Sequence, residues 1–503
     1  MTDNDTTTGS RLDELMDVRR GKVAALRELD VEPFAYSFRP SHTVAEVAAT
    51  WGEGLAPGDE TGVQVAVAGR VVADRDVGRL RFLVLREAGA ELQVFVVKKQ
   101  LAEHDAAVLG LVDVGDWLGV EGEVLATRTG ELSVRPGTVT MLSKALRPLP
   151  DKHHGLVDVE QRSRQREIDL VVNDTSRRVF EVRHRVLRAL RDAMVDRGFV
   201  EVETPMLHPI PGGASARPFV THHNTLDTDL YLRIAPELYL KRLLVGGLPR
   251  VFEVNRSFRN EGMSTRHNPE FTMLESYEAY ADVEDVMALF EALVVAAAEA
   301  VGTTELTYQG REVSLAPPFR RVPLLDLVRE AVGQPELSYD TPVEVLVALC
   351  ERHEVHVEEA WGSGRLVVGL YEALVEGHLW EPTLVTEHPV ETSPLARRHR
   401  DPAKHHVTER FEALITGREF GNAFTELVDP DDQRERFAAQ AKAKAAGDDE
   451  AMVLDEPYLR AMEHGMPPCG GLGVGVDRLV MLLADVGSIR DVILFPTLRP
   501  ERG

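Results

Sequence analysis

The 503-residue chain has only two cysteines, Cys350 and Cys469, and no Cys-x-x-Cys pair. Their number and separation argue against a disulfide framework or a structural zinc site. No apolar run reaches the roughly 20 residues that a membrane-spanning helix needs. The N-terminal MTDNDTTTGS is polar and acidic, without the basic and apolar regions of a secretion signal. We therefore expect a cytoplasmic protein that has no membrane segment.

Two common nucleotide-binding signatures are also missing. No GxxxxGK[ST] run occurs, and the glycine-rich stretch at 470–475 does not continue as GxGxxG because Arg478 stands at the next glycine position. Neither a P-loop nor a dinucleotide-binding fold is predicted.

Positive charge is scarce, with 57 Lys and Arg against 82 Asp and Glu and a formal net charge of -25. Nucleic-acid phosphates bind Lys and Arg, so this balance argues against general nucleic-acid binding. Any contact with RNA has to be made by a local group of residues.

The length exceeds that of a single core, so more than one domain is expected. We predict a helical extension over residues 1–60, because apolar residues recur at helical spacing from residue 11 to residue 30. Short apolar or alternating runs separated by glycines follow over 61–146, with a helical connection near 99–109. This pattern indicates an OB-fold barrel, although another small β-barrel or sandwich has the same periodicity.

Residues 147–175, rich in Pro, Arg and His, are expected to be a linker. Its arginines, Arg162, Arg164 and Arg166, either contact RNA or form ion pairs. Residues 176–503 mix helices and strands without βαβ alternation. We predict an antiparallel sheet flanked by helices, and hence an α+β protein.

Two segments of this last region predict one polar pocket. As a strand, VFEVNRSFRNEG (251–262) alternates polar residues with the apolar Phe252, Val254 and Phe258. A second strand, EFTMLESY (270–277), has its own alternating face, and the two strands are expected to be antiparallel. The pocket residues predicted from these faces are Asn255, Ser257, Arg259, Glu261, Phe271, Met273, Glu275 and Tyr277, with Arg266 and His267 at the rim.

A hairpin is predicted over residues 411–422, with Thr416 and Gly417 at its turn. In that register Leu414 faces Glu419, and Glu412 shares the face of Glu419. Two carboxylates there suit a magnesium–phosphate cluster, although they are equally compatible with an exposed hairpin. Strict alternation turns Asn422 to the face opposite Glu419, and only a bulge or bend near Gly421 would bring the two residues to one face, as the family resemblance given below implies.

Several of these segments resemble one known family. FRNEG through RHNPEFTMLE (258–275) is similar to the second signature motif of class II aminoacyl-tRNA synthetases, in its lysine-specific form. GFVEVETPML (198–207) resembles the first motif, which forms the dimer interface in that family, and GLGVGVDRLVM (471–481) resembles the third. The similarity runs from about residue 11 to the end, so the chain resembles bacterial class II lysyl-tRNA synthetases.

The resemblance implies that the chain activates L-lysine with ATP and Mg²⁺ and transfers it to the 3′ end of tRNA(Lys), as a homodimer. A synthetase-like paralogue that lysylates a protein or lipid, and a non-catalytic RNA-binding paralogue, are the alternatives. The barrel argues against the protein-modifying version, and a non-catalytic paralogue would not need Arg259, Glu412, Glu419 and Arg478 together.

The resemblance also implies a role for individual residues. Arg259 and Arg478 are expected to be catalytic. The implied ATP-binding residues are Arg259, Glu261, Arg266, His267, Phe271, Glu412, Glu419 and Arg478, of which Glu412 and Glu419 hold the metal. The implied lysine-binding residues are Gly213, Glu237, Arg259, Glu275, Tyr277, Asn422 and Glu426.

Phe82 and Gln93 are the implied anticodon-binding residues, and Phe95 is a weaker candidate. A ring stacks on an unpaired base and an amide reads its edge. Phe82 in the barrel core is the alternative. Departures from the family pattern flank the pocket at Ser276, Ala423, Thr425 and Cys469.

Overall fold

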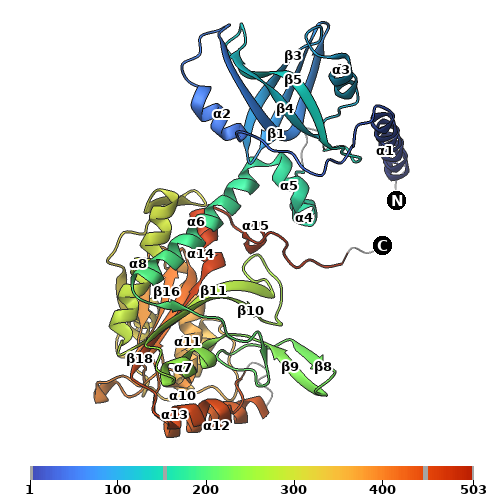
Figure 1. The fold of residues 1–503 in the computed structure, drawn as a ribbon. Coiled ribbons are helices and arrows are strands. Elements are labelled where there is room, and N and C mark those ends of the chain that lie inside the picture. Colours follow the sequence, from blue (N-terminus) through green and yellow to red (C-terminus); the bar gives the residue numbers. More distant parts are fainter. Residues whose placement is uncertain (1–3, 151–155, 446–450, 501–503) are drawn as a thin grey trace. The chain divides into compact units, whose positions relative to one another are not determined.

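The computed structural model describes residues 4–150, 156–445 and 451–500. The chain forms two compact units, Met1–Arg177 and Arg178–Gly503, each described here by itself (Figure 1). Within the described residues, no helix combines the length and the apolar character needed to cross a membrane.

The first unit contains a closed five-stranded barrel with the strand order β1-β2-β3-β5-β4, as expected for an OB fold. Its strands are β1 (Glu60–Val77), β2 (Leu80–Glu87), β3 (Ala90–Val97), β4 (Trp117–Ala126) and β5 (Leu132–Ser143), and α3 (Glu103–Gly110) connects β3 to β4. Alternation along β2 and β3 places Leu83, Leu85 and Val94 in the core, each without solvent exposure.

Four further helices belong to this unit: α1 (Asn4–Glu28), α2 (Val44–Trp51), α4 (Val159–Arg164) and α5 (Arg166–Val172). The last two lie in the segment predicted to be a linker. Arg162 and Arg166 both bind the buried carboxylate of Asp169, at 2.9 and 2.6 Å, and Arg164 pairs with Glu160. Ion pairing is therefore what the structure shows for these arginines.

The second unit is built on an eight-stranded sheet of order β14-β15-β16-β17-β18-β11-β10-β6. Its strands are β6 (Val200–Glu201), β10 (Arg250–Phe258), β11 (Glu270–Ala279), β14 (Arg320–Pro323), β15 (Thr383–Thr386), β16 (Arg410–Ile415), β17 (Arg418–Thr425) and β18 (Cys469–Gly475). All neighbours are antiparallel except the outer pairs β14–β15 and β10–β6. Two small sheets accompany it, formed by β7 (Leu207–His208), β8 (Val220–His223) and β9 (Thr228–Leu232), and by β12 (Glu305–Tyr308) and β13 (Arg311–Ser314).

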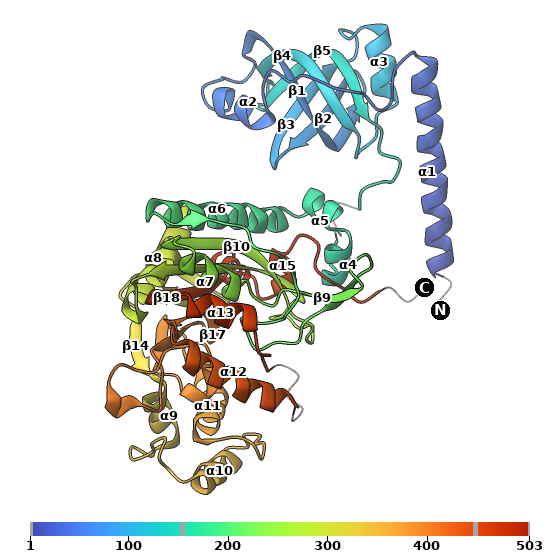
Figure 2. The ribbon, with the colours of Figure 1, turned by 60° about the horizontal axis from the view of Figure 1, so that its bottom comes forward.

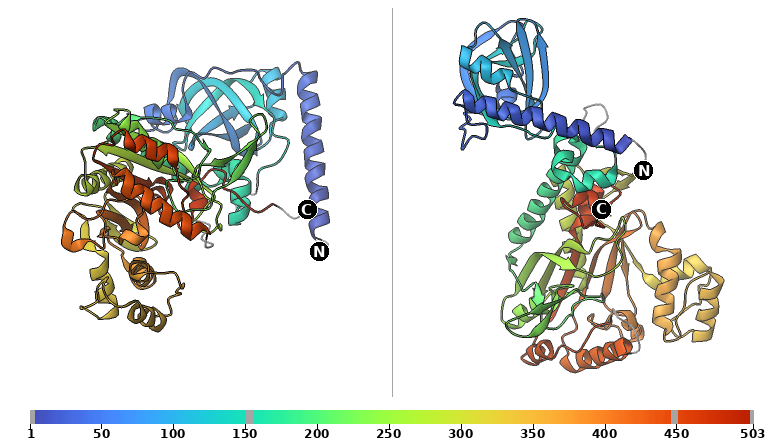
Figure 3. Two further views of the ribbon diagram at one scale, coloured as in Figure 1. Left: turned by 90° about the horizontal axis from the view of Figure 1, so that it is seen from below. Right: turned by 90° about the vertical axis from the view of Figure 1, so that its right-hand side faces the viewer.

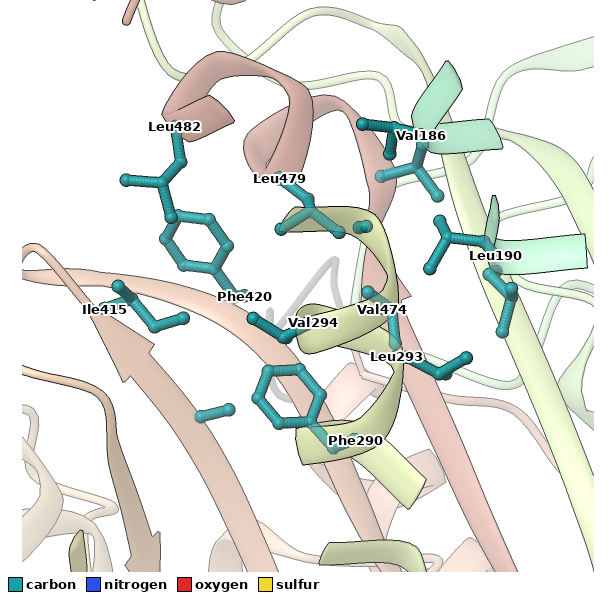
Figure 4. Close-up of a cluster of buried hydrophobic side chains, with 14 of the residues drawn as sticks. Val186, Leu190, Phe290, Leu293, Val294, Ile415, Phe420, Val474, Leu479 and Leu482 are labelled. Atoms are coloured by element: carbon teal, nitrogen blue, oxygen red, sulfur yellow. The ribbon is translucent and has the colours of Figure 1, made fainter. Parts of the chain in front are cut away.

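One face of the large sheet is covered by α6 (Asp174–Asp196), α8 (Val283–Val301) and α14 (Val476–Leu483). In Figure 4, Phe290, Leu293 and Val294 of α8 lie among side chains from the strands, including Phe420 and Val474. These side chains are buried, and this layer is the main hydrophobic core of the unit.

The opposite face carries two separate groups of helices. The first packs on β10 and β11 and consists of α7 (Glu237–Val245), α12 (Pro430–Ala445) and α13 (Glu456–Glu463). The second, α9 (Leu324–Val332), α10 (Val343–Arg352) and α11 (Ser363–Leu374), gathers near the β14 edge (Figures 2 and 3). Between the two groups, the central strands and the short α15 (Ile489–Val492) line a cavity.

Replacing Phe290 by alanine should lower the free energy of unfolding by about 3–5 kcal/mol, because it leaves a cavity where α8 meets the sheet. Urea denaturation followed by circular dichroism measures this loss. Phe495→Ala is the matched control, since that ring is 70% exposed and its removal should cost no more than about 0.5 kcal/mol. Equal losses would contradict the assignment of the core.

Candidate active site

Strands β10 and β11 form the pocket wall that their alternation predicts. Their register pairs Ser257 with Phe271, Asn255 with Met273 and Glu253 with Glu275. Residues directly opposite in an antiparallel pair point to the same face. The predicted polar face is therefore confirmed, and Arg259 continues it just beyond the end of β10.

The hairpin of β16 and β17 contains the expected bulge. Leu414 faces Glu419, whereas Ala413 faces Gly421, so Phe420 is the extra residue. Phe420 turns into the core beneath the sheet, and Asn422 stays on the pocket side with Glu419. The bulge explains how Glu419 and Asn422 can face one pocket although strict alternation would place them on opposite faces.

Strand β18 forms the floor of the pocket with alternate glycines. Gly471, Gly473 and Gly475 lie opposite Tyr277, Glu275 and Met273. A Cβ at Gly471 would lie 2.0 Å from Glu426 Oε1 and 2.6 Å from Tyr277 Cε1. The floor thus needs a residue without a side chain at Gly471. The sequence interpretation missed this role, although the period-two spacing of the glycines was the available signal.

Most of the residues predicted to bind the nucleotide line one cavity of about 270 Å³. The Arg259 guanidinium lies 5.1 Å from the centroid of the Phe271 ring, and its buried Nε has no hydrogen-bond partner among the described residues. Arg478 donates to the carbonyl oxygen of Glu419 at 2.6 Å. The predicted residues on this lining are Arg259, Glu261, Arg266, His267, Phe271, Glu419, Asn422 and Arg478.

A cavity that holds several guanidinium groups suits an anion. Burial and the neighbouring Arg478 lower the pKa of His267, which favours its neutral form and leaves the positive charge to the arginines. A buried guanidinium nitrogen without a partner costs free energy unless an acceptor binds it. The geometry therefore favours a phosphate at Arg259.

Glu412 does not belong to the lining of this cavity, but it faces the same side of the sheet. It lies opposite Asn422, and Arg410 bridges the two residues, at 2.5 Å to Glu412 and 3.0 Å to Asn422. The sequence interpretation missed Arg410. No cluster of three or more potential metal ligands occurs in the described parts of the chain.

The other end of the site is strongly acidic and closed to water. Glu237, at the start of α7, Glu275 and Glu426 are all buried. Tyr277 donates a hydrogen bond to Glu275 at 3.2 Å. Gly213 adopts a left-handed backbone with φ +87°, and a Cβ there would lie 3.1 Å from Glu237 Cβ. The structure thus brings together four of the five residues predicted for the acidic end, and the fifth, Gly213, lies next to Glu237.

Burial dominates the electrostatics of this end. It raises the pKa of Glu275 to about 8, with a further contribution from Glu237. Burial also raises the pKa values of Glu237 and Glu426, and the ammonium of Lys241 opposes both shifts. Lys241, a second residue that the sequence interpretation missed, donates to Glu237 and forms an ion pair with Glu426.

The four departures from the family pattern are all buried close to this end: Ser276, Ala423, Thr425 and Cys469. Thr425 donates to Glu409 at 2.7 Å and accepts from the amide of Val283 at 3.0 Å. These bonds tie β17 to the start of α8, so Thr425 has a structural function.

Phe82 lies on the outer surface of the barrel and is only partly buried. Its ring is 5.5 Å from that of Phe95, and the Arg75 guanidinium is 4.9 Å from its centroid. Gln93, on the same face, donates to Ser133 at 2.9 Å. Phe82 is therefore not barrel core, and an arginine lies beside it.

Comparison with protein families agrees with both units. Residues 158–499 match the family of tRNA synthetases class II (D, K and N). Residues 65–142 match the OB-fold nucleic acid binding domain.

Individual relatives match almost from end to end. The chain is 48% identical to the lysine–tRNA ligase of Carboxydothermus hydrogenoformans, over 97% of this chain and 99% of the relative. It is 49% identical to that of Serratia proteamaculans, over 96% of both chains, and 47% identical to that of Bacillus subtilis, over 97% and 98%. The chain therefore belongs to the class II tRNA synthetases and, within them, to the lysine–tRNA ligase family.

Replacing Gly471 by alanine should lower the free energy of unfolding by about 1–3 kcal/mol, because the new methyl group overpacks against Glu426 and Tyr277. Gly475→Ala is the matched control on the same strand. The nearest atoms to its Cβ lie at 3.7 Å, so its stability should change by less than about 1 kcal/mol. Urea denaturation of both variants compares them, and a neutral Gly471→Ala would contradict the glycine floor.

Proposed function

We propose that the chain activates L-lysine with ATP to lysyl-adenylate and then transfers the lysyl group to the 3′ end of tRNA(Lys). The observation that carries this proposal is the pocket of Glu237, Glu275 and Glu426, buried beside a cavity lined by arginines. Buried carboxylates need cationic partners, and lysine brings two ammonium groups. The lysine–tRNA ligases that match nearly the whole chain support the same activity.

In activation, a carboxylate oxygen of lysine attacks the α-phosphorus of ATP, and the bond to the leaving pyrophosphate breaks. Negative charge develops on the phosphate oxygens, and a fixed guanidinium stabilises it. Arg259 fills this role, because its Nε is buried without a partner in the described structure. In transfer, a ribose hydroxyl of the tRNA attacks the carbonyl carbon and AMP leaves.

The remaining nucleotide contacts follow from the lining of the cavity. Phe271 stacks on adenine, Arg478 lies against its opposite face and Glu261 is near it. Arg266 and His267 contact the outgoing phosphates.

Glu412 and Glu419 fit a magnesium ion. Their oxygen donors suit this cation, which protein sites hold through one or two carboxylates together with substrate phosphates. Both carboxylates lie beside arginines in the structure, Glu412 with Arg410 and Glu419 with Arg478. A bound magnesium ion would neutralise phosphate charge.

Lysine lies with its α-ammonium at Glu237 and Gly213 and its side-chain ammonium at Glu275, Tyr277 and Glu426. Asn422 and Arg259 hold its carboxylate, which places the nucleophile next to the phosphate site. The burial of these carboxylates supports the assignment.

Arg259→Ala should reduce lysine-dependent ATP–pyrophosphate exchange by about 10²–10³-fold, because the developing charge loses its fixed donor. Arg256→Ala is the control. Arg256 lies on the same strand with a half-exposed side chain, 3.8 Å from Glu270, so exchange should stay within about twofold of the unmodified protein. Unchanged exchange in Arg259→Ala would remove this residue from the mechanism.

The barrel reads the anticodon of tRNA(Lys). Phe82 stacks on an unpaired base, Gln93 reads a base edge and Phe95 extends the aromatic surface. Arg75 supplies local positive charge beside the Phe82 ring.

Phe82→Ala should weaken tRNA charging by about one to two orders of magnitude, since base stacking contributes roughly 1–3 kcal/mol. Pyrophosphate exchange without tRNA should be unchanged, because its groups lie in the second unit. Tyr36→Ala, which removes a 98% exposed ring from the first unit, is the control and should charge tRNA normally. Equal damage to both reactions by Phe82→Ala would refute the anticodon role.

The active form is a cytoplasmic homodimer. Apolar side chains around the segment that resembles the first class II motif stay exposed, including Val200, Met206 and Leu207 at 53%, 50% and 43%. An exposed apolar group of this kind favours burial against a second copy. Val202, on the same segment, is partly buried against the hydrophobic cluster to which Leu244 and Tyr277 belong. Light scattering of the purified protein tests the dimer.

A further inference from the structure

The acidic end of the site already contains one ammonium group of the protein itself, that of Lys241. The side chain extends from α7 and has no solvent exposure. It donates to Glu237 and forms an ion pair with Glu426, whose side chain is also fully buried. The nitrogen lies 5.3 Å from the ring centroid of Phe424 and 5.8 Å from that of Tyr277.

The groups that surround this ammonium come from every element packed around it and are mostly acidic. The titratable and charged groups are Glu237 on α7, Glu275 and Tyr277 on β11, Arg410 on β16, Glu426 just after β17, Tyr458 on α13 and Cys469 on β18. Arg410 is already bound to Asn422 and Glu412. Lys241 is thus the cation in direct contact with Glu237 and Glu426.

When Glu237, Glu275 and Glu426 are all ionised, the one resident ammonium leaves a charge of minus two. Burial by itself would lower the pKa of Lys241, but Glu237 and Glu426 together raise it well above its usual value. The lysine therefore stays charged. Removing its charge would leave Glu237 and Glu426 buried without a counter-ion, and such groups take up protons.

We propose that Lys241 is a positioning residue whose buried ammonium keeps Glu237 and Glu426 ionised and in place to receive the ammonium groups of the amino-acid substrate. The inference rests on the proposed function. The minus-two charge that remains matches the two ammonium groups of lysine, whereas an amino acid with an uncharged side chain leaves one buried carboxylate uncompensated.

Lys241→Met keeps an unbranched, flexible side chain that is one atom shorter and removes its charge. In this variant a carboxylate of the pocket takes up a proton. The proton restores the net charge of the pocket but neutralises a carboxylate that the substrate needs. Lysine has to expel this proton to bind, so its KM should rise about tenfold or more at pH 7 while the KM for ATP is unchanged. As pH rises this proton is lost, so the KM for lysine of the variant should fall by up to about tenfold per pH unit more than the KM of the unmodified protein does. This extra dependence of KM on pH is the added slope.

Pyrophosphate exchange from pH 6.5 to 8.5 separates this role from packing. If Lys241 only fills space, Lys241→Met raises the KM for lysine by one factor at every pH, which would overturn the proposal. Adding Glu426→Gln to Lys241→Met removes a titrating group and should reduce the added slope. Lys144→Met is the matched control, because Lys144 is a fully buried lysine held by Asp113 and Asp116 in the first unit; it should leave the slope unchanged.

Calorimetry on the unmodified protein tests the proposal even if Lys241→Met does not fold. Lysine titrations at pH 7 in buffers of different ionisation enthalpy count the protons released on binding. At most one is expected, from Glu275, whose pKa is about 8, because Lys241 keeps the other two carboxylates ionised. Release of two or more protons would overturn the inference. Absence of lysine binding would instead refute the proposed function.

Discussion

A carboxylate that is shielded from water stays ionised only when a positive charge or a hydrogen-bond donor lies beside it. The amino-acid end of the site is arranged around this constraint. Glu237, Glu275 and Glu426 come from three different elements, and Lys241 and the Tyr277 hydroxyl are their partners within the protein. In the proposed function, the charge that these partners leave uncompensated gives the pocket its preference for a cationic amino acid.

The large sheet puts this acidic end next to a basic one. Alternation on β10 and β11 directs polar side chains to one face, and the core residues Phe252 and Leu274 to the other. The bulge at Phe420 returns Asn422 to the pocket face. Glycines on β18 let Glu426 and Tyr277 approach the floor. The proposed phosphate site and the proposed ammonium site therefore adjoin on one sheet, an arrangement that would hold the lysine carboxylate close to the phosphorus it attacks.

The acidic character of the chain is compatible with its proposed work on RNA when base stacking provides the contact. On the barrel, Phe82 and Phe95 form a partly exposed aromatic pair, with Arg75 against the first ring. Stacking on bases depends less on net charge than phosphate contacts do. Specificity for unpaired bases is thus available to a protein with a net charge of -25.

The sequence by itself determined the elements with a strong period and the chemistry of the motifs. Period-two alternation indicated a small β domain and the pocket face, and together with the family's use of both Glu419 and Asn422 it indicated a bulge near Gly421. The similarity at residues 258–275 gave the family.

What only the tertiary structure decided depends on contacts between distant elements. In the sequence, Lys241 has the appearance of an ordinary cation on an amphipathic helix. Folding nevertheless buries it against Glu426, 185 residues further along the chain. Arg410 and the glycines of β18 likewise gain their function from neighbours on other strands. Periodicity specifies which way a side chain points, but burial and partners are set by the packing of elements that are far apart in sequence.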